Sequence, residues 1–235
     1  MITASLTFCL LWWISILVVY ICGNIMYNCN TNVNKGESMT KTEQLIKMCK
    51  KNKGYIFTSE VMEAGISRTY LAKFVKESNM ERVAQGIYIC EDTWLDELYI
   101  LQKRYDDIVY TGMTALYLHG LVDREYSQIE VVVPAPFNGS RLREEGVIVH
   151  QIRPEIYELG ITTVDTNFGN TVRVHDKEKC ICDTILHRGQ IEVQHFQSAL
   201  KEYMSETDKR LSVLMKYAEK MNMRDEVMKY VEVMT

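Results

Sequence analysis

The chain of 235 residues carries 27 Lys and Arg against 31 Asp and Glu, a formal net charge of −4. Its hydrophobic content of 47% is enough to bury a core, and its length suits two domains. The seven cysteines follow no framework spacing, which argues against a disulfide-stapled secreted domain and indicates free thiols in a reducing cytosol.

Residues 1–38 differ from the rest of the chain. Residues 1–34 contain no charged side chain, and the stretch LTFCLLWWISILVVYICG is apolar over about one bilayer crossing. In one interpretation this stretch is a transmembrane helix, and the lysines after it keep the downstream chain in the cytoplasm as part of a single-pass membrane protein. In the other, which we favour, the codons for Lys35–Glu37 spell a ribosome-binding sequence and translation begins at Met39. The protein is then cytoplasmic and meets no membrane.

Residues 39–93 predict a winged helix-turn-helix domain. A helix over Lys41–Lys51 is followed by the stretch FTSEVMEAG, in which Thr58 is the expected N-cap of a second helix and Gly65 its end. Ser67 is the expected N-cap of a third helix, whose apolar side chains recur at helical spacing at Leu71, Phe74 and Val75. Two short helices joined by a tight turn that contains glycine are typical of a helix-turn-helix.

The next segment, MERVAQGIYIC, predicts the wing. We expect strands over Met80–Val83 and Ile87–Cys90, joined by a turn at Gln85–Gly86. A β-hairpin that directly follows a helix-turn-helix makes a winged helix.

Charge is divided unevenly along the chain. Residues 39–90 contain nine Lys and Arg against five Asp and Glu, whereas residues 91–235 contain 17 against 25. Most charge clusters are ordinary solvated helix faces. Here, however, an acidic protein concentrates its positive charge on the segment that has the pattern of a DNA-binding motif.

The third helix is the expected recognition helix. Such helices enter the major groove with their N-terminal residues, here Ser67–Tyr70, while Lys73, Lys76 and Arg82 would neutralise phosphates. The sequence therefore predicts a DNA-binding surface formed by Thr58, Ser67, Arg68, Thr69, Tyr70, Lys73, Lys76, Arg82 and Gln85.

Residues 94–235 predict a mixed α/β domain with a helical C-terminus. Strand-like and helical segments alternate as far as KEKCICDTILH, which indicates a sheet covered by helices. Residues 192–235 are helical in pattern, with breaks near Ser205 and Asn222. The fold class expected for the chain is α+β, a winged helix-turn-helix followed by this α/β domain.

The second domain offers few candidates for catalysis or metal binding. His119 lies at a helix end, where an interaction with the helix dipole is more typical than a role as general base. Cys180 and Cys182 would point their thiols about 200° apart on one helix, so they cannot share a zinc ion. An acidic nuclease cluster is only weakly indicated, because no lysine follows its first member at the expected spacing; its members would be Glu130, Asp176 and Asp183. We expect no catalytic residue, no metal and no cofactor.

Four stretches of the chain resemble a known family. FTSEVMEAGISRTYLAKFVKESNMERVAQGIYI, TALYLHGL, IEVVVP and VRVHDKEKCICDTI, within about Lys41–Leu186, are similar to the AbiEi antitoxins of bacterial type IV toxin–antitoxin (abortive infection) systems. The most specific match is Arg82–Tyr88, which fits the family's R-x-x-x-G-x-Y wing. The resemblance implies an N-terminal domain that represses its own operon by binding DNA. It also implies a C-terminal domain that counters a toxin resembling a nucleotidyltransferase, without requiring direct contact with it. Residues 1–38 depart from the family.

Two other functions stay open. The chain can be a transcriptional regulator without a toxin partner, or a winged-helix nuclease that acts on DNA through its α/β domain. A neighbouring gene for a nucleotidyltransferase-like protein would separate the antitoxin from both. The expected partners are operator DNA of its own promoter, the cognate toxin, and other copies of the chain bound to the same DNA.

Overall fold

The computed structural model describes residues 39–234. The apolar segment of residues 1–38, with its two interpretations, lies outside the described residues. Contacts group the described residues from Leu45 onward into one compact unit. Within residues 39–234, no helix combines the length and the apolar character that a membrane crossing requires.

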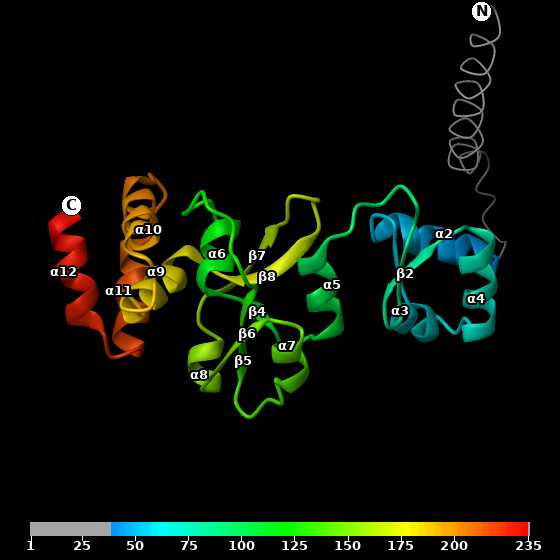
Figure 1. Ribbon diagram of the computed structural model, residues 1–235, viewed down its shortest axis with the longest axis horizontal. Coiled ribbons are helices and arrows are strands. Elements are labelled where there is room, and N and C mark those ends of the chain that lie inside the picture. The colour runs from blue at the N-terminus through cyan, green and yellow to red at the C-terminus, as the bar shows by residue number, and fades with distance from the viewer. Residues whose placement is uncertain (1–38, 235) are drawn as a thin grey trace, which may run out of the picture. The chain divides into compact units, whose positions relative to one another are not determined.

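A winged helix forms the first part of the described chain (Figure 1). Its three strands pair antiparallel in the order β1–β3–β2. The predicted helix-turn-helix and wing are confirmed, and β1 is a strand that the sequence pattern did not predict. In chain order the elements are α2 (Lys41–Lys51), β1 (Tyr55–Phe57), α3 (Thr58–Glu63), α4 (Arg68–Glu77), β2 (Glu81–Ala84) and β3 (Ile87–Ile89).

Two apolar clusters stabilise the winged helix. The first consists of Leu45, Ile56, Val61, Ile66, Leu71, Phe74 and Met80. The second consists of Tyr55, Phe57, Ile87, Ile89 and Ile100, the last of these from α5 (Glu97–Arg104). Successive residues of a strand point to opposite faces, so the middle residue of β1 joins one cluster and its two neighbours the other. Helix α5 therefore packs on this sheet although it lies after residue 93. The domain boundary expected after residue 93 stays a prediction.

The rest of the chain forms a mixed sheet with helices around it (Figure 1). The strands follow the order β6–β5–β4–β8–β7, in which β5 and β6 are parallel, β4 and β8 are parallel, and the other two pairs are antiparallel. They are β4 (Val109–Tyr110), β5 (Glu130–Pro134), β6 (Ile148–Ile152), β7 (Ile161–Asp165) and β8 (Thr171–His175). The helices after α5 are α6 (Gly112–Leu118), α7 (Ser140–Glu144), α8 (Pro154–Tyr157), α9 (Lys177–Leu186), α10 (Val193–Ser205), α11 (Leu211–Lys220) and α12 (Arg224–Met234).

Both faces of this sheet are covered. In β5, Val131 and Val133 belong to the main core of the domain, whereas Val132 packs on the other face with Val109 and Tyr157. A continuous apolar run is what a strand covered on both faces requires. The expected α/β domain with a helical C-terminus is therefore confirmed.

A buried ion pair lies within α9. Lys179 Nζ is 2.6 Å from Asp183 Oδ1, and the two side chains are 2% and 16% exposed. Burial raises the pKa of Asp183, but the charge of Lys179 and the hydrogen bond with His175 outweigh it and lower the pKa to about 2. The carboxylate therefore stabilises the fold at pH values above 3.8, the ordinary pKa of an aspartate. This contribution is lost as the pH falls through about 2.

We expect Asp183→Asn to lower the free energy of unfolding at pH 7 by about 2 kcal/mol, the free energy that corresponds to this lowered pKa. Denaturant unfolding at pH 7 measures the change. Glu192→Gln is the matched control, because Glu192 faces Arg124 at 3.6 Å with side chains 65% and 67% exposed. The control should change the free energy by less than about 1 kcal/mol, as exposed pairs do. Equal losses in both variants would contradict the role given to the buried pair.

Candidate nucleic-acid interface

The turn between α3 and α4 depends on a glycine and a buried isoleucine. Gly65 has a φ of +75°, which side chains with a β-carbon rarely adopt. Ile66 is 1% exposed, and its N–H donates to the Val61 carbonyl at 3.1 Å. These two residues end α3 where the sequence predicted and fix the direction in which α4 leaves the turn.

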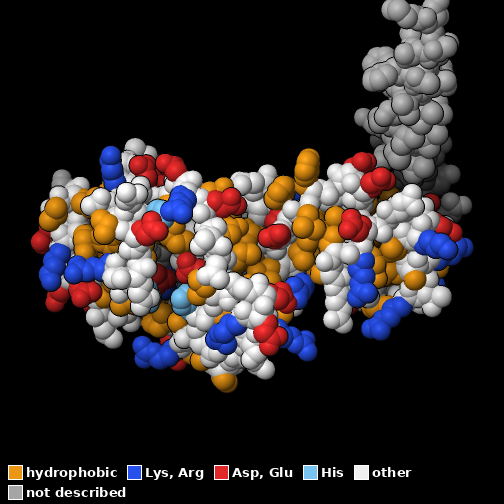
Figure 2. Space-filling model, in the orientation of Figure 1, with side chains coloured by type: hydrophobic (Ala, Val, Ile, Leu, Met, Phe, Trp, Pro, Cys, Tyr) orange, Lys and Arg blue, Asp and Glu red, His pale blue; other side chains and the backbone are white. Residues whose placement is uncertain are grey.

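Helix α4 has one buried and one exposed face. The Ser67 hydroxyl oxygen accepts a hydrogen bond from the Tyr70 N–H at 3.3 Å, so the predicted cap is confirmed. Leu71 and Phe74 are buried in the core. Figure 2 shows Lys and Arg side chains standing out from the surface of the winged helix. The solvent-exposed positions of the helix and its cap include Ser67, Arg68, Thr69, Ala72, Lys73 and Lys76.

The wing places two further polar residues at the surface. Gln85 lies at its tip and Arg82 on β2, and both are exposed. The Arg82 Nε–H donates to the Ala84 carbonyl at 3.3 Å, which holds the guanidinium along the strand. Met80 connects the wing to α4, because its N–H donates to the Val75 carbonyl at 3.0 Å.

Thr58 differs from its expected role. Helix α3 begins at Thr58 itself, with Phe57 at the N-cap position and no side-chain cap. The expectation that Thr58 caps this helix is therefore wrong. Its N–H donates instead to the Gly86 carbonyl at 2.8 Å, which puts the start of α3 against the wing.

All nine residues of the predicted DNA-binding surface are accessible. Seven are exposed and the other two, Thr58 and Tyr70, are half-buried. Exposed guanidinium and ammonium groups can pair with phosphates, and polar side chains at a helix N-terminus can reach base edges. The contact of these residues with DNA stays a prediction.

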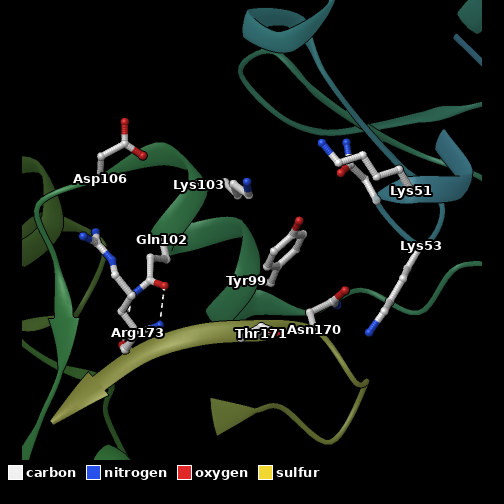
Figure 3. Close-up of a pocket in the computed structure, with 10 residues that line it drawn as sticks. Lys51, Lys53, Tyr99, Gln102, Lys103, Asp106, Asn170, Thr171 and Arg173 are labelled. Atoms are coloured by element: carbon white, nitrogen blue, oxygen red, sulfur yellow. Dashed lines mark hydrogen bonds between the residues drawn. The ribbon is translucent and has the colours of Figure 1, made fainter. Parts of the chain in front are cut away.

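A second group of cations, which the sequence did not indicate, surrounds a pocket of about 530 Å³ (Figure 3). Lys51 and Lys53 come from the end of α2 and the turn after it, Lys103 from α5, and Arg173 from β8. Asp106 is the one acidic residue among those that line it. This excess of positive charge favours an anionic ligand.

The floor of this pocket is held by an amide side chain. Gln102 Nε2 donates to the carbonyls of Ile108 and Arg173 at 3.1 and 3.0 Å, and its oxygen accepts from the Arg173 N–H at 2.6 Å. Lys103 Nζ lies 4.9 Å from the Phe57 ring centroid and 5.5 Å from that of Tyr99. No sequence spacing could reveal this group, because Lys103 and Arg173 meet only when α5 packs on β8.

The candidate catalytic groups of the second domain have structural partners. His119 Nε2–H donates to the His175 carbonyl at 2.7 Å, and burial lowers the pKa of His119. The buried thiols of Cys180 and Cys182 donate in different directions, to the carbonyls of His175 at 3.4 Å and Leu214 at 3.7 Å. Among the described residues, no group of three or more His, Cys, Asp or Glu is placed to hold a metal ion.

The three carboxylates of the nuclease alternative also serve separate purposes. Glu130 accepts from the Met113 N–H at 3.0 Å. Asp176 caps α9 by accepting from the Lys179 N–H at 2.9 Å, and Asp183 pairs with Lys179. Glu130 and Asp183 line one cleft of the second domain, and Asp176 is not among the residues that line it. The nuclease alternative gains no support from this arrangement.

Residues 39–124 match the family described as "Transcriptional regulator, AbiEi antitoxin N-terminal domain". We call this matched part of the chain the AbiEi domain. The AbiEi domain thus includes the whole winged helix and continues through α5 and α6. It identifies the chain as one that carries a transcriptional-regulator domain.

A solved structure is also similar to this chain. It is the crystal structure of the RV2827C protein from Mycobacterium tuberculosis, with 10% sequence identity and a TM-score of 0.49. The similarity covers 78% of this chain and 73% of that one. No curated protein sequence matches the chain significantly.

Proposed function

We propose that this chain is the antitoxin and autorepressor of a two-gene toxin–antitoxin system. In this proposal the AbiEi domain binds operator DNA at its own promoter, in the cytoplasm, with several copies of the chain bound to neighbouring sites. The remaining chain counters a nucleotidyltransferase-like toxin. The observation that carries the DNA-binding half is the exposed basic face of α4, capped by Ser67, on a winged-helix core. The proposed action against a toxin is supported by the match of residues 39–124 to an antitoxin family.

The proposed roles follow from the position of each side chain. Arg68 and Thr69 stand in the exposed first turn of α4, so we assign them to base edges together with Ser67 and Tyr70. Phosphate contacts fix orientation and carry no sequence information. We assign them to the exposed cations farther along α4 and on the wing, with Thr58 and Gln85 at the edge of the surface; these cations are Lys73, Lys76 and Arg82.

The charge of the remaining chain favours a partner other than DNA. Residues 125–235 contain 14 Lys and Arg against 18 Asp and Glu. A surface with this net charge repels phosphates over the distances that steer association. A protein toxin is therefore the better partner for most of this surface, and the proposal includes no catalytic activity.

Two readouts in one host test the proposal. A reporter gene joined to the chain's own promoter should be repressed when the full chain is expressed, and growth arrest by the neighbouring toxin gene should be relieved. Repression without relief of growth arrest would favour a transcriptional regulator that has no toxin partner. Cleavage of promoter DNA by the purified chain would favour the nuclease. Absence of both repression and relief would contradict the proposal entirely.

A further inference from the structure

Two cysteines that are far apart in sequence meet in the winged helix. Cys49 lies in α2 and Cys90 directly after β3, and their Sγ atoms are 3.1 Å apart. Both side chains are half-buried and both are free thiols. The sulfurs of a disulfide are about 2.05 Å apart, so a movement of about 1 Å closes the bond.

Backbone hydrogen bonds hold the two cysteines in this position. The Gly54 N–H donates to the Cys49 carbonyl at 2.9 Å, and the Cys90 N–H donates to the Gly54 carbonyl at 3.0 Å. Gly54 has a φ of +94°, and a β-carbon added to it would collide with the Thr93 side chain. The residue that ties both cysteine backbones together is therefore restricted to glycine.

We propose that Cys49 and Cys90 form a modification site at which a hydroperoxide produces a reversible intramolecular disulfide. The Cys90 thiolate attacks one peroxide oxygen, the O–O bond breaks, and hydroxide or an alkoxide leaves, so that Cys90 becomes a sulfenic acid. The Cys49 sulfur then attacks the Cys90 sulfur, the S–S bond forms, and the S–O bond breaks. The oxygen leaves as water with the proton of Cys49. The two thiols lose two electrons and the peroxide gains two.

The opposite pKa shifts of the two thiols assign them different roles. The hydrogen bond between the two thiols lowers the pKa of Cys90 to about 7 and raises the pKa of Cys49. The thiolate is the reactive form, so Cys90 reacts with the peroxide and Cys49 resolves the sulfenic acid. Cys180 and Cys182 provide the contrast, because both are buried and burial raises the pKa of each.

The disulfide would enclose the functional part of the winged helix. All nine residues of the predicted DNA-binding surface lie between Cys49 and Cys90 in the sequence. A cross-link of this kind restricts the unfolded chain and makes the enclosed segment harder to unfold. The modification is independent of whether that segment binds DNA.

To test the proposal, the reduced full chain is treated with hydrogen peroxide and its remaining thiols are blocked with an alkylating reagent. Disulfide-linked peptides are then mapped without reduction. Mapping is necessary because the chain has seven cysteines. We expect a Cys49–Cys90 linked peptide, its loss after dithiothreitol treatment, and a melting temperature several degrees higher in the oxidised protein. The Cys180→Ala and Cys182→Ala variant, which removes two buried thiols, should form the same link.

Single variants then test the order of the two steps. Cys49→Ser should leave a sulfenic acid at Cys90 that dimedone traps, whereas Cys90→Ser should leave Cys49 reduced. Trapping at Cys49 in the second variant would reverse the assigned roles. Alkylation of both cysteines in the peroxide-treated wild-type chain, or a link from either one to a third cysteine, would overturn the proposal without reference to any variant.

Discussion

Replacing Arg68, Lys73 and Lys76 together with alanine should lower the affinity for the promoter by about a hundredfold or more, since each such contact contributes roughly 1–3 kcal/mol. The three side chains occupy the exposed face of α4, so the substitutions leave its buried side unchanged. The pair between Lys73 and Glu77 is exposed at 3.7 Å and contributes little to folding. Fluorescence anisotropy with the promoter fragment and with unrelated DNA measures the loss.

The three single variants should differ in whether they affect binding to the promoter alone or to all DNA. Arg68→Ala should lower the affinity for the promoter more than for unrelated DNA, because a base contact carries sequence information. Lys73→Ala and Lys76→Ala should lower both affinities similarly. Each should also reduce the slope of log affinity against log salt concentration by about one, because each removes one phosphate contact.

A control removes the same type of charge from the other end of the chain. Lys201, Lys220 and Lys229 are exposed on α10, α11 and α12. Their triple alanine variant should bind the promoter as the unaltered chain does. An equal loss in both triple variants would show that net charge, and not α4, determines the affinity. Unchanged binding of the α4 variant would remove this helix from the interface.

Local sequence signals were sufficient for the helix-turn-helix. Ser67 accepts the predicted capping bond, and Gly65 adopts the left-handed conformation expected after α3. Both signals depend on neighbours a few residues away, so they can be read without knowledge of the fold. The hairpin after α4 was readable for the same reason, since its turn falls at Gln85–Gly86.

The elements that were missed lack such local signals. Strand β1 has three buried residues in succession, Tyr55–Phe57, and therefore no alternation. Strand β7, Ile161–Asp165, lies at an edge of its sheet and is not fully buried at any position. Thr58 has the residue type of an N-cap, but its N–H is bonded to the wing. In each case a tertiary contact decides the structure.

The sites that were missed are formed by residues distant in sequence. Cys49 and Cys90 meet because Gly54 bonds to both of their backbones. Lys103 and Arg173 belong to the part of the chain with net negative charge, yet they line one pocket with Lys51 and Lys53. The division of charge along the sequence is therefore not a division of the surface.

This packing also determines how the two proposed roles can be separated by experiment. Tyr99 of α5 packs edge-on against Tyr55 and Phe57, at ring-centroid distances of 5.2 and 5.8 Å. Ile100 belongs to the same cluster. A fragment that ends at residue 93 would expose this face of the sheet to water and lose part of its stability. Substitutions in the full chain avoid that loss.

Expressed from an independent promoter, the full chain with Arg68, Lys73 and Lys76 replaced by alanine should fail to repress its own promoter and still relieve toxin-induced growth arrest. The reason is that the substitutions remove the proposed phosphate and base contacts but leave residues 91–235 unchanged. Reporter activity and growth, measured in the same cells at equal protein levels, give the two results. The triple variant of Lys201, Lys220 and Lys229 should repress and protect.

Growth is the decisive measurement for the antitoxin role, because an antitoxin that acts without binding its toxin gives a negative pull-down and still protects. Loss of protection together with loss of repression in the α4 variant would show that DNA binding and neutralisation are not separable. Loss of protection in the unaltered chain, while repression persists, would leave a repressor whose acidic portion faces some partner other than the toxin.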